Sequence, residues 1–278
     1  MPDQDPTRDA LGVWDAVAPA WERNRQRLFE SLRAVSQWLV DKVDPRAGKT
    51  ILELAAGPGE TGFLAAERLG PSGRLISTDL VPAMVEAARR GGRALDNAEF
   101  RVMDAQQIDL PDASVDGVLC RFGLMLVPDP GRALAESRRV LRAGGRLAYA
   151  VWGPPDRNPW LALLGMALSQ QGHPPPGDAF GPGGVFSLTE PERNRELVAA
   201  GGFREVQTEE IALSMHFDSI DDYWGFQTEV AGPLALVVRS LPASEVESIK
   251  NALEPIVAAF RSANGYEIPA LAIGVCAA

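Results

Sequence analysis

The sequence predicts an α/β fold of the Rossmann-like, doubly wound class, with a mostly parallel seven-stranded sheet. Three observations lead to this prediction. Short apolar runs alternate with amphipathic helical stretches between residues 50 and 152, a glycine-rich turn follows the first run, and Gly, Pro and Asp separate the segments. This alternation is typical of parallel strands joined by right-handed crossovers, with helices on both faces of the sheet.

Each element follows from its own local pattern. Apolar residues at helical spacing over 11–43 predict one or two helices ahead of the core. Short apolar runs predict strands near 50–56, 74–79, 99–103, 115–121, 145–152, 204–217 and 269–275. Helical periodicity predicts helices near 60–69, 82–93, 130–141, 159–170, 189–200, 219–239 and 242–262.

The order of these elements predicts a domain layout. Residues 1–45 form an N-terminal helical segment and residues 46–153 a cofactor-binding core. Residues 154–278 complete the core and carry helical lid insertions at about 154–188 and 218–264, the second of them just before the last strand. A chain of 278 residues suits one elaborated domain.

Composition and charge exclude several classes of function. The net charge of -10 and the lack of a dense basic tract disfavour a nucleic-acid partner. The start, MPDQDPTRDA, does not resemble a secretory signal, and the apolar runs are too short to cross a bilayer. Cys120 and Cys276 do not have a metal-ligand spacing, so no metal is expected. We therefore expect a cytoplasmic protein acting on a small molecule; a homodimer is compatible with the sequence.

The segment ILELAAGPGETG, residues 51–62, carries the strongest chemical signal. Glycines at the turn let a ligand approach the backbone and the free N–H groups of the next helix. Gly57, Gly59 and Gly62 also satisfy the dinucleotide-binding spacing, with Asp79 placed to hold a ribose. Glu53 favours a different cofactor, because its carboxylate could receive an α-ammonium group, which NAD lacks. The alternative for Glu53 is a solvated charge at the strand end.

Four blocks in order resemble a known family over about a hundred residues. They are ILELAAGPG, LISTDLVPAMVEAA, FRVMDAQQIDLPDASVDGVLCRFGLMLVPDP and VLRAGGRLAYAVW. This chain thereby resembles the class I S-adenosylmethionine-dependent methyltransferases, specifically the small-molecule, type 11 group similar to ubiquinone and menaquinone biosynthesis enzymes. The resemblance implies S-adenosyl-L-methionine as cofactor and transfer of its methyl group to an oxygen or carbon, in preference to a nitrogen.

The resemblance also implies a role for each residue that matches the motifs. The family commonly has glycine at the position of Ala55. The implied cofactor-binding residues are Glu53, Ala55, Gly57 and Gly59 along the methionine part, Asp79 on the ribose hydroxyls, Leu80 and Met84 beside the adenine, Asp104 and Ala105 at the adenine edge, and Arg121 and Phe122 near the reacting methyl group. On local pattern alone, Asp79 could instead cap a helix and Asp104 could be an ordinary turn residue.

Two histidines are candidates for a general base, should the acceptor need one. His216 lies where a late strand meets the lid, so we hypothesise that it deprotonates the acceptor. His173 lies among prolines in QGHPPP, typical of an exposed loop. Aromatic and thioether residues also gather in the lid, where they form either an apolar acceptor pocket or simply the core of the lid: Trp160, Met166, Phe180, Phe186, Met215, Phe217, Tyr223, Trp224 and Phe226.

Two other functions remain open on the sequence. A nicotinamide-dependent oxidoreductase would use the same glycine turn, although the chain has no evident Tyr-x-x-x-Lys pair. A catalytically inactive S-adenosylmethionine-binding protein would keep the cofactor-facing acids without turnover.

Overall fold

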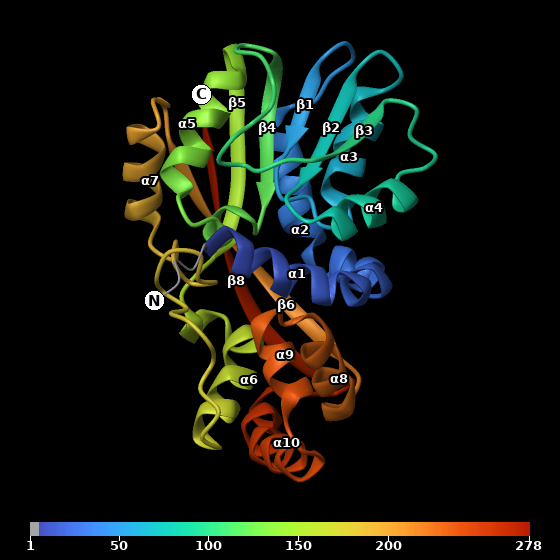
Figure 1. The fold of residues 1–278 in the computed structure, drawn as a ribbon, viewed down its shortest axis with the longest axis vertical. Coiled ribbons are helices and arrows are strands. Elements are labelled where there is room, and N and C mark those ends of the chain that lie inside the picture. Colours follow the sequence, from blue (N-terminus) through green and yellow to red (C-terminus); the bar gives the residue numbers. More distant parts are fainter. Residues whose placement is uncertain (1–5) are drawn as a thin grey trace.

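The computed structural model describes residues 6–278 and contains one twisted sheet of eight strands (Figure 1). Seven strands follow the order β3-β2-β1-β4-β5-β8-β6, and β7 pairs with β8 alone. The neighbours from β3 to β5 are parallel, whereas β8 is antiparallel to both β5 and β6. The strands are β1 Thr50–Glu53, β2 Arg74–Asp79, β3 Ala98–Val102, β4 Val115–Arg121, β5 Leu141–Trp152, β6 Gln207–Phe217, β7 Arg261–Ser262 and β8 Gly265–Ala277.

Ten α-helices in the described part of the chain surround this sheet, and six of them begin with a proline, which needs no N–H partner in the first turn. None of the helices in residues 6–278 is both long and apolar enough to span a membrane. The helices are α1 Pro6–Arg23, α2 Arg25–Val43, α3 Glu60–Leu69, α4 Pro82–Gly91, α5 Pro130–Val140, α6 Pro159–Gln170, α7 Pro191–Ala200, α8 Ile220–Val230, α9 Pro233–Ser240 and α10 Ala243–Val257.

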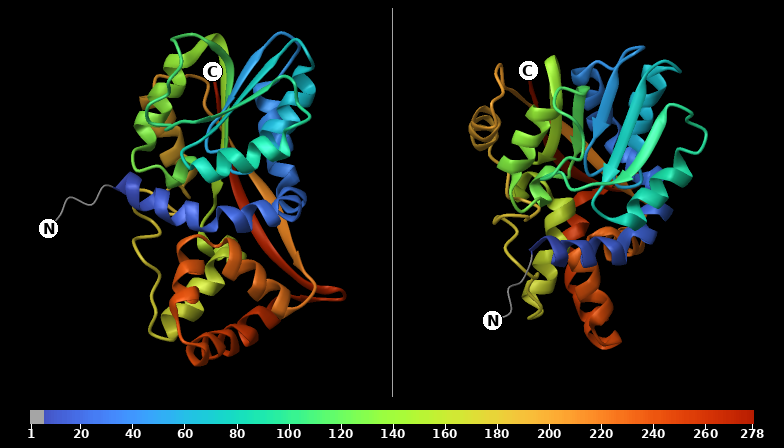
Figure 2. Two further views of the ribbon diagram at one scale, coloured as in Figure 1. Left: turned by 45° about the vertical axis from the view of Figure 1, so that its right-hand side comes forward. Right: turned by 45° about the horizontal axis from the view of Figure 1, so that its top comes forward.

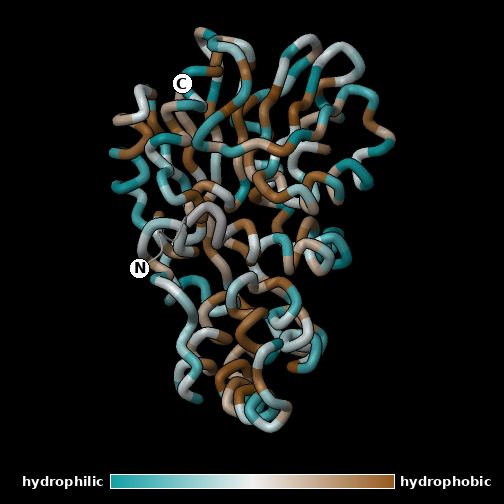
Figure 3. The backbone as a smooth tube through the Cα atoms, in the orientation of Figure 1, coloured by the Kyte–Doolittle hydropathy of each residue, from teal (hydrophilic) through white to brown (hydrophobic). Residues whose placement is uncertain are grey.

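The sheet supplies the core of the molecule. Helix α2 packs on α3 and crosses β4, β5 and β6, while α5 packs with α7 and β5. Hydrophobic residues concentrate along the central strands and the inner sides of the helices (Figure 3). The carboxyl ends of β1, β2, β4 and β5 therefore meet at one edge of a rigid scaffold, where ligands bind in open α/β sheets.

The ribbon of β6 and β8 continues past this carboxyl edge and leads to helices α6, α8, α9 and α10 (Figures 1 and 2). These four helices are called the lid below. Helix α1 crosses between the core and the lid and contacts α4 on one side and α8 on the other. The carboxyl edge thus faces α1 and the lid rather than bulk solvent.

The fold confirms the predicted class. Several boundaries differ from the prediction, and four of these differences have a clear physical reason. Strand β1 ends at Glu53 because Ala55 takes a positive φ of 48°. The helix predicted over 219–239 is two helices, since Gly232 has a φ of 55° and Pro233 starts α9 afresh. The helix predicted over 242–262 ends at Val257, and its tail forms β7. Strand β8 is longer than predicted because it pairs with β6 along that strand's whole length.

Candidate functional site

Glu53 holds the glycine-rich turn from inside the protein. Its side chain is 1% exposed, and its carboxylate accepts hydrogen bonds from Gly62 N at 2.8 Å and from Ser77 Oγ at 2.7 Å. Helix α3 starts after Gly59, which has no side chain to cap it, so the carboxylate serves the free N–H in the first turn. The structure thus places Glu53 beneath the turn, and the solvated strand-end alternative is wrong.

Burial also changes the charge of this group. Desolvation raises the pKa of Glu53 to about 8, against the hydrogen bonds from Ser77 and Gly62 and the charge of Arg121, all of which lower it. Near neutral pH the carboxyl group is therefore mostly protonated. A neutral carboxyl group is a weaker partner for an ammonium ion than an ionised carboxylate is.

This raised pKa predicts a specific pH dependence of stability. Between about pH 5 and pH 8 the folded state holds a proton on Glu53 that the unfolded state has lost, so the free energy of unfolding falls as pH rises. Relative to that of Glu53→Gln, the free energy of unfolding of the wild-type protein should fall by roughly 1 kcal/mol per pH unit across this window. Above the window the difference between the two proteins should stay constant. Urea unfolding of both proteins at pH 5, 6, 7 and 8 measures this difference. If the free energy of unfolding changed with pH equally in both proteins, the prediction would be wrong.

Asp79 ends β2 directly beside the same turn. Oδ2 accepts a hydrogen bond from Gly57 N at 2.8 Å and Oδ1 accepts one from Val81 N at 2.9 Å, and the side chain is 9% exposed. Burial raises the pKa of Asp79, while those backbone donors oppose the shift. An ionised carboxylate has about four acceptor positions, so two remain for the hydroxyl groups of a ligand.

Space for a ligand lies next to Gly57. This residue has a φ of 56°, and a Cβ atom added to it would meet nothing within 4 Å. Gly59, with a φ of 96°, differs because a Cβ there would lie 2.7 Å from the ring of Phe63. The turn therefore offers open backbone at Gly57 while Gly59 lets α3 pack closely.

The remaining predicted adenine contacts lie on the next strands. Asp104 follows β3, and its Oδ1 accepts a hydrogen bond from Gln106 N at 2.8 Å, so it does form a turn of its own. Ala105 and Leu80 are half-buried beside these strand ends. Met84 is 3% exposed and packs with Ala18 of α1, so it lies beneath that helix.

The end of β4 combines backbone strain with aromatic packing. Phe122 and Ala55 both adopt positive φ values, 59° and 48°, which are unusual for residues other than glycine. The Phe122 ring stacks on Trp152 with centroids 3.7 Å apart and planes 7° apart. Residues held in such conformations cluster at functional sites, which makes this corner a candidate position for chemistry.

Arg121 points away from that corner. Its Nη1 donates a hydrogen bond to Ser36 Oγ in α2 at 2.9 Å, and burial lowers its pKa against the charges of Glu60 and Glu53. Only the backbone of Arg121 therefore lies at the strand end.

Sequence reasoning missed Glu60, the first residue of α3. It is 8% exposed, and among residues 6–278 its Oε1 has no hydrogen-bond partner, with Arg25 Nε 3.7 Å away. Burial raises its pKa, and the charges of Arg121 and Arg25 lower it. The only local signal was its place one residue after the GPG turn. Its burial beside Arg25 depends on how α2 packs, which the sequence does not show.

His216 does not join the other predicted residues. Its side chain is 45% exposed on the β6–β8 ribbon, with Nδ1 2.8 Å from Glu267 Oε1 and Nε2 3.2 Å from Asp218 Oδ1. The hydrogen bonds to Glu267 and Asp218 raise its pKa, which favours the cationic imidazolium over the neutral base. His173 pairs with Glu245 of α10 at 2.7 Å. Both histidines therefore lie beside carboxylate groups, away from the predicted cofactor-binding residues.

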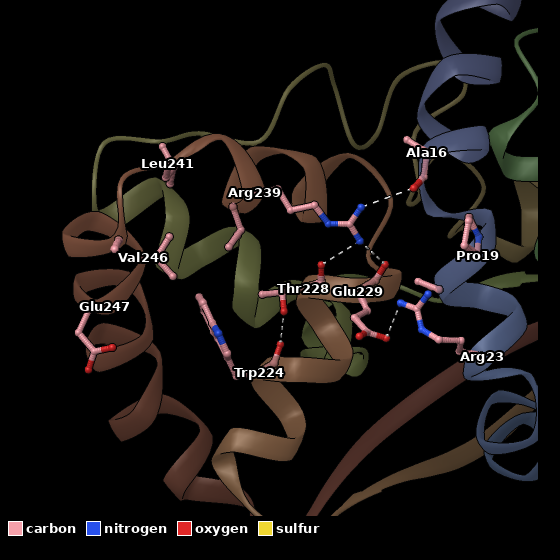
Figure 4. Close-up of a pocket in the computed structure, with 13 residues that line it drawn as sticks. Ala16, Pro19, Arg23, Trp224, Thr228, Glu229, Arg239, Leu241, Val246 and Glu247 are labelled. Atoms are coloured by element: carbon pink, nitrogen blue, oxygen red, sulfur yellow. Dashed lines mark hydrogen bonds and ion pairs between the residues drawn. The ribbon is translucent and has the colours of Figure 1, made fainter.

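Most of the aromatic residues of the lid form its core, as the plainer interpretation predicted. Phe217 contacts both Tyr223 and Phe226, and all three rings are buried, whereas Met166 and Phe180 are exposed. A cavity of about 880 Å³ lies between α1 and helices α8, α9 and α10, with Trp224 on its wall (Figure 4). Arg239 reaches from α9 across it to the carbonyl oxygens of Ala16 and Glu229. This cavity includes none of the predicted cofactor-binding residues.

Comparisons with known proteins agree with this geometry. A family model described as a methyltransferase domain matches residues 52–149. The chain is 33% identical over 149 residues to the ubiquinone/menaquinone biosynthesis C-methyltransferase of Hahella chejuensis, covering 51% of this chain and 59% of that protein. It is 30% identical over 211 residues to the demethylmenaquinone methyltransferase of Thermus thermophilus, covering 69% of this chain and 91% of that protein.

The fold has a matching solved structure as well. The YcgJ protein of Bacillus subtilis aligns with a TM-score of 0.57 at 21% identity, covering 87% of this chain and 96% of that one. The chain spans less than two thirds of some curated relatives, 36% of one and 59% of the Hahella protein. The two relatives named above are methyltransferases, so they give no support to the oxidoreductase alternative.

Proposed function

Because this chain belongs to the methyltransferase domain family, together with the demethylmenaquinone methyltransferases, we propose that it transfers a methyl group from S-adenosylmethionine to a small molecule. The observation that carries the proposal is the edge formed by Gly57 and Asp79. There, open backbone lies beside a carboxylate whose oxygens retain free acceptor positions. The acceptor atom is a carbon or an oxygen rather than a nitrogen, and the acceptor is apolar or aromatic.

The residues of this edge fit the parts of the cofactor. Asp79 accepts hydrogen bonds from the two ribose hydroxyls, and the Gly57 backbone lies along the methionine part. Leu80 and Met84 lie on the adenine side, with Asp104 and Ala105 at its polar edge. Glu60 Oε1, which has no hydrogen-bond partner among the described residues, accepts a hydrogen bond from the α-ammonium group of the methionine part. Arg25, beside Glu60, pairs with the α-carboxylate of the methionine part. Glu53 is a positioning residue that holds α3 and the turn.

The chemistry asks little of the protein beyond orientation. Bound S-adenosylmethionine supplies a sulfonium methyl group that is already activated for transfer. Phe122 and Trp152 exclude water from the corner at the end of β4, and the rigid strand ends fix the geometry of approach. No general base is assigned, since both histidines lie beside carboxylate groups away from this edge.

Calorimetry tests the cofactor, and a product assay tests the reaction. We expect S-adenosylmethionine and S-adenosylhomocysteine to bind with micromolar affinity, on the order of -8 kcal/mol, and NAD to give no binding heat. Incubation with S-adenosylmethionine and a panel of phenols, quinols, amines and carboxylic acids should yield a methylated product. Binding of NAD in place of S-adenosylhomocysteine would overturn the proposal, and cofactor binding without any product would reduce it to a cofactor-binding protein.

A further inference from the structure

Helix α1 separates the cavity between α1 and the lid from the cofactor-binding edge. The residues of α1 that line the cavity are Ala16, Pro19, Ala20 and Arg23. The residues of α1 that form a hydrophobic cluster with Met84 of α4 are Leu11, Trp14, Ala18 and Trp21. With 3.6 residues per turn, these two sets lie on opposite sides of the helix. A molecule in the cavity would therefore lie on the far side of α1 from Met84, in a site separate from the proposed methyl-transfer site.

The cavity has the size and the apolar walls of a small-molecule site. Its volume of about 880 Å³ is within the range of about 300–1,000 Å³ that such sites usually have. Half-buried Trp224 of α8 forms one wall, and Val238, Leu241 and Val246 line the cavity from the lid (Figure 4). A tryptophan ring offers a flat apolar surface on which another aromatic ring can stack. These walls fit a ligand with a flat apolar body.

Arg239 is a cation of this cavity that is not paired with a carboxylate. Its guanidinium group donates hydrogen bonds to Glu229 O at 3.2 Å and to Thr228 O and Ala16 O at 3.5 Å (Figure 4). These distances exceed the usual value of about 2.9–3.0 Å, so the bonds are weak. The other arginine of the cavity, Arg23, lies 3.5 Å from a carboxylate oxygen of Glu229. Among the side chains that the structure describes, Arg239 has no such ion pair.

The two carboxylates of the cavity leave Arg239 unneutralised. Glu229 Oε2 accepts a hydrogen bond from Asn24 Nδ2 at 2.8 Å and pairs with Arg23, so this group already has its partners. Glu247 is exposed and lies at the opposite end of the cavity from Arg23 (Figure 4). The end of the cavity beside α1 therefore has two cations against one anion, and this excess positive charge favours an anionic group of a ligand.

We propose that this cavity binds a small aromatic carboxylate, with the ring of the ligand on Trp224 and its carboxylate on Arg239. A guanidinium group binds a carboxylate through two parallel charge-assisted hydrogen bonds, which are stronger than the long bonds that Arg239 now makes to backbone oxygens. The ligand contacts α1, α8 and α9 together. It is not methylated there, because α1 lies between it and the cofactor. This inference does not depend on the proposed function.

A matched pair of probes tests the role of the charge. 2-Naphthoate and 2-naphthamide share the same fused rings, but only 2-naphthoate is an anion near neutral pH. In calorimetry, wild-type protein should bind 2-naphthoate about tenfold or more tightly than 2-naphthamide, as expected for hydrogen bonds between charged groups.

Variants of Arg239 identify the group that recognises the anion. Arg239→Gln should lose most of the preference for 2-naphthoate, and Arg239→Lys should keep part of it, because lysine keeps the charge without the planar fork. Arg138→Gln is the control, since Arg138 is exposed on α5 and does not line the cavity. An unchanged preference in Arg239→Gln would overturn the inference.

A second pair of variants leaves Arg239 in place. Ala16 is exposed on α1 and lines the cavity, and its carbonyl oxygen lies 3.5 Å from Arg239 Nη1. Ala16→Glu brings a carboxylate to this wall to compete for Arg239, so it should bind 2-naphthoate about tenfold more weakly than Ala16→Gln, which has the same shape without the charge. Equal affinities in these two variants would overturn the inference.

A competition measurement locates the probe. Saturating S-adenosylhomocysteine should leave the affinity for 2-naphthoate unchanged, because α1 separates the two sites. Competition between them would place the probe at the cofactor-binding edge and would overturn the inference. If S-adenosylhomocysteine does not bind at all, the proposed function fails, while the variants of Arg239 and Ala16 still decide the inference about the cavity.

Discussion

Replacing Gly62 by alanine is expected to destabilise the protein strongly, although alanine normally favours a helix. A Cβ atom at Gly62 would lie 2.1 Å from Glu53 Oε2 and 2.8 Å from its Cδ, and both groups are buried. Because the carboxyl group is held between Gly62 N and Ser77 Oγ, it has no other position that keeps both hydrogen bonds. We expect a loss of roughly 3 kcal/mol in the free energy of unfolding, from overpacking and a displaced buried polar group.

A double-variant cycle identifies the cause. In a Glu53→Ala background the clash with the carboxyl group is gone and only a 3.1 Å contact with Leu75 Cδ2 remains, which that side chain can relieve into the vacated space. There Gly62→Ala should stabilise α3 by up to about 1 kcal/mol instead of destabilising it. Gly225→Ala in α8 is the matched control, because a Cβ there meets nothing within 4 Å and the change should be neutral or slightly stabilising. Denaturant unfolding of the wild type, the two single variants, the double variant and Gly225→Ala measures these free energies. Equal costs of Gly62→Ala with and without Glu53 would show that the carboxyl group is not responsible.

Replacing Asp79 by asparagine is expected to weaken S-adenosylhomocysteine binding by about 30-fold or more, or about 2 kcal/mol, the loss of charge-assisted hydrogen bonds to a diol. Asparagine has almost the same shape, but its amide nitrogen cannot accept from Gly57 N or Val81 N, the donors that fix this side chain now. The ribose would then lose its partner and the turn would lose one of its supports. Calorimetry at a temperature where the variant stays folded measures the affinity.

Asp116 provides the control for a general effect of losing a charge. It lies near the start of β4, at the opposite edge of the sheet, where its Oδ2 accepts from Thr50 N at 2.8 Å and from Arg142. Asp116→Asn should lower stability without changing S-adenosylhomocysteine affinity. Similar losses of affinity in both variants would place the cofactor away from Asp79.

The sequence alone determined the order and type of the elements and the residues at the strand ends. Apolar runs, glycine turns and helix-initiating prolines are local signals, so the strands up to β5 and Asp79 at the end of β2 follow from nearby residues. The structure differs from the prediction where strand pairing or a single backbone angle outweighed the local sequence signal. Pairing with β6 lengthens β8, and the positive φ of Gly232 ends one helix before α9 begins.

Only the tertiary structure decided what the charged and polar side chains face. Glu53 is mostly protonated because the core around it excludes water, and Glu60 Oε1 has no hydrogen-bond partner and only Arg25 nearby because of how α2 and α3 pack. His216 faces outward because its register on β6 sets it opposite Glu267. Burial and pairing depend on contacts between residues far apart in the chain. The pattern of neighbouring residues does not show which distant residues come into contact.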